Sequence, residues 1–375
     1  MKKVFATFIL VVSLIVLFTT TGFALDQDEF LKQQYESSGA GELMNELPRE
    51  TQEMLRSLGI DEVEFNQLYK VSYSNLFGVL KDVVLGQLDN PLKFVVVMVG
   101  ILILMSIVQT IVPPDDNKAV DLICSLFFII AVLGSMMSYS SQIISAIDAS
   151  CKFMIAFIPV FTAVLAISGN PAAAISYNTV AMLIAQSASG ISNVFLIPLV
   201  VMFAALSISA SVSPALSMDG LVDMLKKTII WLLTAVCTFF TGFLSLKDIM
   251  VSSADTMAVR SGKALVGALV PIIGNSLSDA YCTILGSMSM LKNAVGAFGI
   301  LAVGLINIPV LVQAGMWILS ISLTSFAAEA MGQKNAAQLL KNINATNVVL
   351  VAILVFNLFL ILISTALVMA FRASV

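Results

Sequence analysis

The chain has 375 residues, of which 59% are hydrophobic and 11% are charged, with a formal net charge of −4 at pH 7. Soluble domains carry roughly 25% charged residues, so this composition excludes an ordinary soluble protein. The chain has no histidine, so it lacks the usual general base near neutral pH and the commonest metal ligand. We predict an all-α polytopic membrane bundle, because about 20 apolar residues cross a bilayer as one helix.

The N-terminus has the pattern of a secretory signal peptide. Lys2 and Lys3 precede an apolar run from Val4 to Phe18, and the small residues of TTTGFA follow. We therefore predict a signal peptide over residues 1–24. A retained signal anchor is the alternative, because this apolar run is long for a signal.

Residues 25–90 form the one clearly polar stretch, with 13 acidic and 5 basic side chains. An excess of negative charge disfavours nucleic acid and anionic lipid as partners. Pro48 fits a first helical position, and Gly59 followed by Ile60 fits a helix C-terminal cap. We predict a small helical extracytoplasmic domain over residues 25–90.

An apolar face recurs at helical spacing in the second half of this domain. The face comprises Phe65, Leu68, Tyr69, Leu76, Phe77, Leu80 and Val84. It either packs within the small domain or lies on the membrane surface, because amphipathicity alone does not separate the two.

The membrane part, 91–375, contains sequence echoes at offsets of 111 to 113 residues. The stretch NVFLIPLVVMFAALSIS at 193–209 matches GLINIPVLVQAGMWILSIS at 304–322, and CSLFF at 124 matches CTFF at 237. These echoes predict an internal tandem duplication, and chance similarity between apolar segments is the alternative. The predicted parts are a lead span (92–112), repeat one (118–226), repeat two (227–340) and a closing span (346–370).

Polar residues and prolines interrupt two apolar segments at corresponding places in the predicted repeats. These interruptions are SGNP at 168–171 and PIIGNSLSD at 271–279. Proline removes a helix hydrogen bond, and freed backbone groups must face protein or water instead of lipid. The sequence therefore predicts broken helices and a pathway at paired positions. The candidate residues are Pro159, Asn170, Pro171, Pro271, Gly274, Asn275, Ser278 and Asp279.

Two features leave the topology and the pathway open. The Asp279 carboxylate marks either an intramembrane pathway or only the water boundary. Basic residues are almost evenly divided between the two sets of short loops, so they do not decide the orientation. A cleaved signal peptide would place residues 25–90 outside the cytoplasm.

Catalytic, cofactor and metal chemistry have no support in the sequence. The four cysteines are widely spaced within or beside apolar segments, which is typical of buried inert thiols. They are Cys124, Cys151, Cys237 and Cys282. No glycine-rich phosphate loop of the ATPase kind occurs, so ATP energy would have to come from a partner.

Two runs carry a resemblance to a known family, SSGAGELMNELPRETQEMLRSLGID at 37–61 and LVPIIGNSLSDAYCTILGSM at 269–288. Together with the overall plan of the chain, they resemble the stage III sporulation protein AE family of endospore-forming bacteria. The resemblance implies a component of the channel-like complex that joins mother cell and forespore, in the mother-cell-derived membrane around the forespore. It implies as partners the other stage III operon membrane proteins and their ATPase, and through them the forespore stage II Q protein.

Two classes of function therefore remain, together with a passive membrane scaffold. The first is a membrane platform or gate of a transenvelope assembly. The second is an autonomous secondary transporter that uses the paired broken helices. Intramembrane ionisable groups are scarce, with Asp279 the one candidate, and this scarcity favours the assembly subunit.

Overall fold

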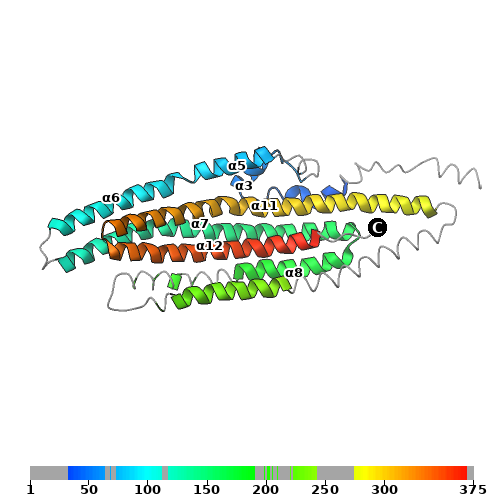
Figure 1. Cartoon of the computed structure of the whole chain (residues 1–375). Helices are drawn as coiled ribbons and strands as arrows, with labels where there is room; N and C mark the ends of the chain where they lie inside the picture. Colours follow the sequence, from blue (N-terminus) through cyan, green and yellow to red (C-terminus); the bar gives the residue numbers. More distant parts are fainter. Residues whose placement is uncertain are drawn as a thin grey trace, which may run out of the picture.

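The computed structural model describes residues 33–63, 73–111, 117–190, 223–242 and 274–369, together with isolated positions between these ranges. Helices dominate these ranges, and no β-strand occurs in them. The long helices lie lengthwise beside one another in one elongated bundle (Figure 1). The all-α expectation is confirmed for the described ranges, whereas the predicted signal peptide lies outside them.

The helices of the described ranges differ widely in length. In chain order they include η1 (Ala40–Glu42), α3 (Arg49–Ser57), α5 (Tyr73–Gly86), α6 (Asp89–Ile111), α7 (Asn117–Ile167), α8 (Pro171–Gly190), α11 (Gly274–Ala330) and α12 (Lys334–Met369). A further helical stretch, Asp223–Gly242, lies between α8 and α11 in the sequence. Five described segments are long and apolar enough to cross a membrane. They are Ser74–Ile111, Leu126–Ile167, Asp223–Gly242, Gly286–Ala330 and Lys334–Ala366. These segments confirm the expectation of a membrane protein with several spanning helices.

Two helical hairpins, α7–α8 and α11–α12, organise the bundle (Figure 1). Each hairpin turns at a glycine in the left-handed conformation, Gly169 with φ 79° and Gly332 with φ 77°. The following N–H groups, of Asn170 and Gln333, donate to carbonyl groups five residues earlier at 3.1 and 2.9 Å. This glycine cap satisfies the last carbonyls of one helix and lets the chain reverse into the next.

Side-chain hydrogen bonds fix these two turns at opposite ends of the bundle. At the α7–α8 turn, the Ser168 hydroxyl donates to the main-chain carbonyl of Met288 on α11 at 2.8 Å. At the α11–α12 turn, the Gln333 amide donates to the Gln109 side chain near the end of α6. Residues far apart in the sequence therefore hold the hairpins in register.

Helices α7 and α11 are longer than a single bilayer crossing requires. They contain 51 and 57 residues, and at 1.5 Å per residue they are about 77 and 86 Å long. Because the hydrocarbon core is about 30 Å thick, each helix must also run through headgroups, water or other protein.

Aromatic side chains pack closely between α7 and α11. Phe153, Phe157 and Phe161 lie one turn apart on α7, with ring centroids 5.7 and 5.3 Å from each other along the stack. Phe298 of α11 lies 6.4 Å from Phe153. Gly299 leaves room for the Phe157 ring, because a Cβ atom at this position would overlap it. We call these five residues the aromatic seam.

The N-terminal segment 33–63 packs on the same part of the bundle. Leu43, Leu55 and Ile60 are buried in one hydrophobic cluster with the aromatic seam. The predicted cap is confirmed, since Gly59 has φ 82° and the Ile60 N–H donates to the Leu55 carbonyl at 3.0 Å. Pro48 lies just before α3 instead of at its first position.

The apolar face predicted at 65–84 is divided in the structure. Leu68 and Leu76 pack against the cluster of the aromatic seam, whereas Phe77 on α5 is 72% exposed. Contact with the bundle therefore accounts for one side of α5, and its exposed apolar side remains available to lipid or protein.

The predicted duplication and its boundaries stay predictions. The two repeats include residues 191–222 and 243–273, which lie almost wholly outside the described residues. The two glycine-capped hairpin turns are separated by far more than the 111 to 113 residues of the sequence echoes, so these turns do not correspond to each other in that alignment.

Candidate functional site

A polar cleft lies between α6, α7 and α11 and continues beneath α3 and α5. It consists of an inner cavity of about 410 Å³ and two outer cavities of about 690 and 460 Å³. The inner cavity shares Asn90, Gln142 and Gln313 with the first outer cavity. The two outer cavities share Gln87 and Pro309. The three spaces are therefore contiguous, and we call them together the polar cleft.

Helix α7 lines the cleft because its polar residues recur at helical spacing. Ser138, Gln142 and Ser145 lie three or four positions apart, on one face of the helix, and all three are exposed. Further along α7, Asp148 and Lys152 form an exposed ion pair of 2.7 Å. This central part of α7 therefore presents polar groups where its first turns present apolar ones.

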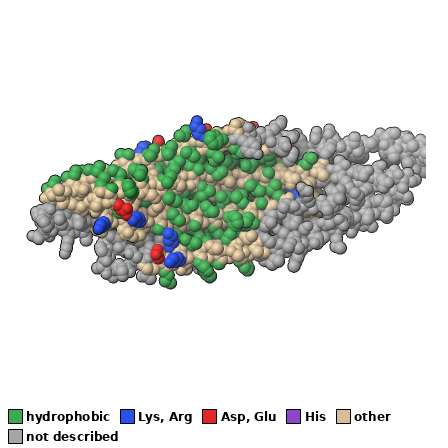
Figure 2. Space-filling view, viewed as in Figure 1, with side chains coloured by type: hydrophobic (Ala, Val, Ile, Leu, Met, Phe, Trp, Pro, Cys, Tyr) green, Lys and Arg blue, Asp and Glu red, His purple; other side chains and the backbone are tan. Residues whose placement is uncertain are grey.

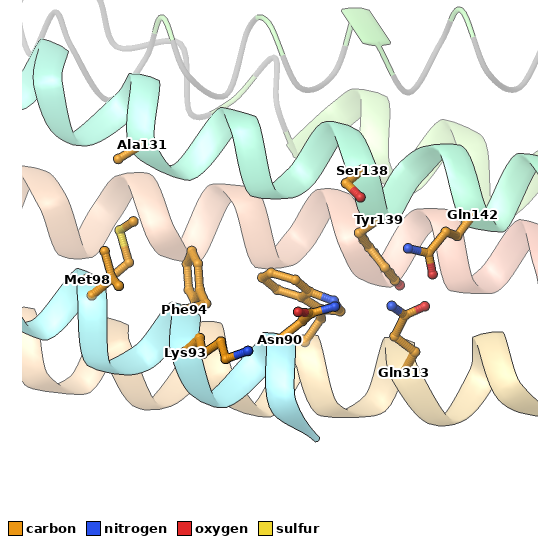
Figure 3. A pocket seen from close by; sticks show the side chains of 11 residues that line it. Asn90, Lys93, Phe94, Met98, Ala131, Ser138, Tyr139, Gln142 and Gln313 are labelled. Atoms are coloured by element: carbon orange, nitrogen blue, oxygen red, sulfur yellow. The ribbon is translucent and has the colours of Figure 1, made fainter. Parts of the chain in front are cut away.

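Aromatic side chains form the wall of the inner cavity. The rings of Phe94 on α6 and Trp317 on α11 meet edge to face with centroids 5.1 Å apart. Tyr139 of α7 completes the wall with its ring 6.0 Å from Trp317. Figure 3 shows Asn90 of α6 and Gln313 of α11 beside this wall, around a common space.

Three polar atoms that are buried within the wall of the inner cavity have no hydrogen-bond partner among the described residues. They are the Tyr139 hydroxyl, the Gln313 amide oxygen and the Trp317 indole nitrogen. The three residues are only 1%, 3% and 6% exposed. An unsatisfied buried polar group costs about 1–3 kcal/mol, so these three atoms lower the stability of the cavity wall.

The inner and outer cavities differ in charge. The inner cavity is lined by a single charged residue, Lys93, and by no carboxylate. The outer cavities are lined by the carboxylates of Glu50, Glu53 and Asp82, with Arg49 as their cation. The cleft therefore carries acidic side chains at one end and a lysine with neutral hydrogen-bonding groups at the other.

The first group of residues predicted from the sequence lies at and before the α7–α8 turn. Helix α7 runs through Pro159 without interruption, so the main chain does not break there. The break falls at 168–170, where Asn170 is buried and its side-chain amide donates to the Ser168 carbonyl at 2.9 Å. Pro171 is the first residue of α8, a position where its missing N–H costs nothing.

The second predicted group lies at the start of α11. Gly274, Asn275, Ser278 and Asp279 are all helical there, while Pro271 lies outside the described residues. Asp279 is nine residues before Met288, the contact of the α7–α8 turn, and so is about 14 Å from it along the helix axis. Along α11 the second group is thus separated from the contact of the first, and Pro159, Asn170 and Pro171 do not line the polar cleft.

Sequence reasoning missed the residues that line the inner cavity. Gln313 and Trp317 are four positions apart on α11, a spacing that places both on one face of a helix. That spacing is visible in the sequence, within a stretch that also carries one of the repeat echoes. A second omission is Lys292, which is 2% exposed within the apolar segment Gly286–Ala330.

The described part of the chain contains no cluster of metal-binding side chains, and its cysteines form no disulfide. Cys151 is buried and Cys124 and Cys237 are half-buried, all as free thiols. Within the same residues, no three histidine, cysteine, aspartate or glutamate side chains gather as metal ligands.

Long apolar helices around a polar cleft define a multi-pass helical membrane protein. Comparison with protein families gives the particular class. The family described as Stage III sporulation protein AE matches residues 52–371, and this chain belongs to that family.

A curated relative agrees with this assignment. The protein named Stage III sporulation protein AE of Bacillus subtilis (strain 168) is 26% identical over 211 residues. The alignment covers 54% of this chain and 53% of the relative, so it spans about half the length of each protein. No solved structure matches the chain. The family membership places the chain among membrane proteins of sporulation.

Proposed function

We propose that this chain is a membrane subunit of the mother cell–forespore channel complex, where it serves as platform or gate during endospore formation. The observation that carries the proposal is the family match over residues 52–371, on a bundle with several membrane-spanning helices. The proposed location is the mother-cell-derived membrane around the forespore, with residues 25–90 on the extracytoplasmic side.

The arrangement of the N-terminal segment supports a docking role for that side. Its apolar residues are buried against α7 and α11, so its position on the bundle is fixed. Carboxylates such as Glu42 and Glu46 remain exposed on its outer surface. A fixed acidic surface on a membrane bundle suits recognition of basic partner domains. The proposed partners are the other stage III operon membrane proteins and their ATPase, and indirectly the forespore stage II Q protein.

A charge-reversal experiment tests this docking role. The variant Glu42→Lys with Glu46→Lys should lose most co-purification of the stage III membrane proteins from sporulating cells, and should form far fewer heat-resistant spores. Both side chains are exposed, so the fold should persist. The matched control, Glu42→Asp with Glu46→Asp, keeps the charges and should behave as the unmodified protein. Unchanged co-purification in the reversed variant, or none with the unmodified protein, would refute the proposal.

A secondary transporter is the second candidate, and one observation favours it. Lys292 is buried within a segment that can span the membrane, and ionisable groups at such depth often mark transport pathways. If the chain transports on its own, Lys292→Gln or Asp279→Asn should abolish solute-driven proton or sodium flux in vesicles. If it acts as a complex subunit, purified vesicles should show no such flux in any variant.

A further inference from the structure

Apolar and charged outer surfaces follow one another in opposite order on the two sides of the bundle. Helices α6 and α12 both pack against α11, with α6, α5 and α3 on one side of it and α12 on the other (Figure 1). The ring contact of Phe94 with Trp317 and the hydrogen bond between Gln333 and Gln109 fix α6 alongside residues 317–333. These contacts give the level of each surface along the bundle axis.

The outward surface of α6 is apolar at this level. Val96, Leu104 and Ile111 are all exposed there, and no charged residue occurs between Lys93 and the end of the helix. Apolar side chains of this kind suit contact with lipid, because the segment is long and apolar enough to cross a membrane.

Beyond α6, the same side of the bundle is acidic. Glu50 of α3 lines an outer cavity together with Leu305 and Pro309 of α11, and Asp82 of α5 lines the next cavity with Pro309. Both carboxylates are exposed. Charged side chains are rare in the hydrocarbon core because their transfer from water is costly, so this level belongs in water on the α3 and α5 side.

The first turns of α12 are polar on their outward surface, at the level where α6 is apolar. Lys334, Gln338 and Lys341 are exposed, and Lys341 forms an ion pair with Glu329 of α11. Glu329 falls within the stretch of α11 that α6 accompanies. A single level of the bundle therefore presents apolar side chains on the α6 side and charged ones on the α12 side.

The later part of α12 is apolar on its outward surface, at the level where the other side is acidic. The Asn344 amide donates to the Ser322 hydroxyl at 2.9 Å, and further along α12 Met369 lies against Gly296. The part of α12 between these contacts contains no charged residue, and Val355 within it is 45% exposed. The order of apolar and charged surfaces on α12 is thus the reverse of that on the α6 side.

A membrane perpendicular to the bundle axis cannot match both sides. If it were centred on the apolar surface of α6, the exposed pair of Lys341 and Glu329 would lie in hydrocarbon. If it were centred on the apolar part of α12, the exposed Glu50 and Asp82 would lie there instead. An inclined membrane avoids both costs, because its surfaces cross the two sides of the bundle at different levels.

We propose that the bundle crosses the membrane obliquely, with its axis inclined by about 40° to the bilayer normal. Lipid then contacts α6 on one side and the later part of α12 on the other. Water reaches the polar cleft from the α3 and α5 side, whereas lipid covers α12 at the same level. This inference rests on the membrane helices of the bundle and does not depend on the proposed role in the channel complex.

The uncharged parts of the helices are long enough for this inclination. Residues 122–147 of α7 and 342–369 of α12 contain no charged side chain, and they are about 39 and 42 Å long at 1.5 Å per residue. A helix inclined by about 40° needs about 39 Å to cross a hydrocarbon core that is about 30 Å thick. An upright helix would need only about 30 Å.

Two pairs of positions test the inclination, because each pair shares a level but lies on opposite sides of the bundle. Leu104 of α6 is paired with Gln338 of α12, and Asp82 of α5 is paired with Val355 of α12. All four side chains are exposed, so a cysteine with an attached nitroxide should leave the fold intact. Each variant would be made in the full-length chain with its four native cysteines replaced by alanine, and reconstituted in phospholipid vesicles.

Collision of each nitroxide with oxygen, which concentrates in lipid, would be compared with collision with a water-soluble nickel chelate. We expect the labels at 104 and 355 to meet mainly oxygen, and the labels at 338 and 82 to meet mainly the chelate. Positions 104 and 355 lie roughly 27 Å apart along the bundle axis. Their measured depths should nevertheless agree within about 10 Å, because the inclination offsets most of that distance.

An upright bundle would give both members of each pair the same environment and would separate positions 104 and 355 by the full axial distance. Either result would overturn the proposal. Access of the nickel chelate to position 104 or 355 would also overturn it, because lipid would then not cover that surface.

The unmodified protein provides a second measurement that needs no substitution. Polarised infrared dichroism of oriented bilayers reports the mean inclination of helices to the membrane normal. Because the long helices run lengthwise beside one another, we expect a mean inclination of about 40° (Figure 1). A mean below about 20°, which is the average for membrane-spanning helices, would contradict the oblique crossing.

Discussion

The aromatic seam and the inner cavity both involve α7 and α11, and α6 adds a third side to the cavity, but the two regions differ in packing and in hydrogen bonding. In the seam, Phe157 is fully buried and packs directly over the backbone at Gly299. In the inner cavity, Tyr139 and Gln313 are nearly as buried, yet each leaves a polar atom without a partner among the described residues. Figure 2 shows hydrophobic side chains spread over this face of the bundle among other groups, with charged side chains gathered at a few places.

This contrast separates a part of the bundle that close packing stabilises from a part that borders an open cavity. Association of helices in lipid depends on close packing and on interhelical hydrogen bonds, because lipid is as apolar as leucine. The seam supplies that packing. The wall of the cavity is less closely packed and contains unsatisfied polar atoms. Proteins commonly tolerate such local losses of stability at functional sites.

Loss of the seam's closest contact should destabilise the protein most. Gly299→Ala places a Cβ atom where the Phe157 ring lies, and that ring is fully buried among its neighbours. Overpacking of this kind costs about 1–3 kcal/mol, measured as a lower midpoint of thermal unfolding in detergent. Gly304→Ala on the same helix meets nothing within contact distance and is the matched control. Equal destabilisation by both substitutions would show that the close packing at Gly299 is not what matters.

A second pair of variants compares buried amides on α11. The Asn307 side chain donates to the Ser150 hydroxyl at 2.8 Å and to the Val303 carbonyl at 2.7 Å. Asn307→Leu should therefore cost about 1–2 kcal/mol, because it leaves the buried Ser150 hydroxyl without its donor. Gln313→Leu should cost less than about 0.5 kcal/mol in lipid-free detergent, since the amide oxygen it removes has no partner among the described residues. Chemical denaturation of both variants checks the order, and a larger loss in Gln313→Leu would contradict the description of the cavity.

At the α7–α8 turn, the loss of stability caused by a substitution should depend on how well the new residue accepts a left-handed backbone conformation. Gly169→Ala places a Cβ atom on a residue with φ 79°, which costs about 1 kcal/mol. Gly169→Asn should cost less, because asparagine accepts the left-handed conformation more readily. Melting temperatures of the two variants measure this difference. If alanine proves as stable as asparagine, the turn does not depend on a left-handed residue.

The weakest effect should appear at the ion pair between the two regions on α7. Asp148 and Lys152 are largely exposed, so Lys152→Ala should lower stability by only about 0.3 kcal/mol. The loss should disappear in high salt, because exposed pairs are screened. A loss that persists in high salt would mean that Lys152 has a role beyond this pair.

The fold class and several helix ends follow from the sequence, because these features are local. Composition and apolar segment length predict membrane helices, and the Gly59–Ile60 pair predicts the end of α3, where the structure has it. The sequence groups Pro159 with the broken segments, but α7 continues through it. Proline removes one backbone hydrogen bond, and in this helix packing by neighbouring helices holds the rest.

The polar cleft does not follow from the sequence, because it depends on contacts between distant segments. Asn90, Gln142 and Gln313 come from three helices, and no local pattern determines which helices pack together. The spacing of the polar residues on α7 places them on one face, but it does not show what that face meets. In apolar sequence, prolines and glycines are easier to recognise than the polar residues that line a cleft. The sequence-based prediction therefore falls at 168–171 and 271–279 instead.

Water access to the polar cleft is the measurement that tests its existence most directly. In a chain whose four cysteines are replaced by alanine, single cysteines would be introduced as Gln142→Cys in the inner cavity and Ala302→Cys beside the aromatic seam. The reconstituted protein would then be exposed to a water-soluble maleimide on both sides of the membrane. We expect rapid labelling at position 142 and none at position 302 until the protein is unfolded. Equal labelling at the two positions, or labelling only at position 302, would contradict a water-accessible cleft beside a closely packed seam.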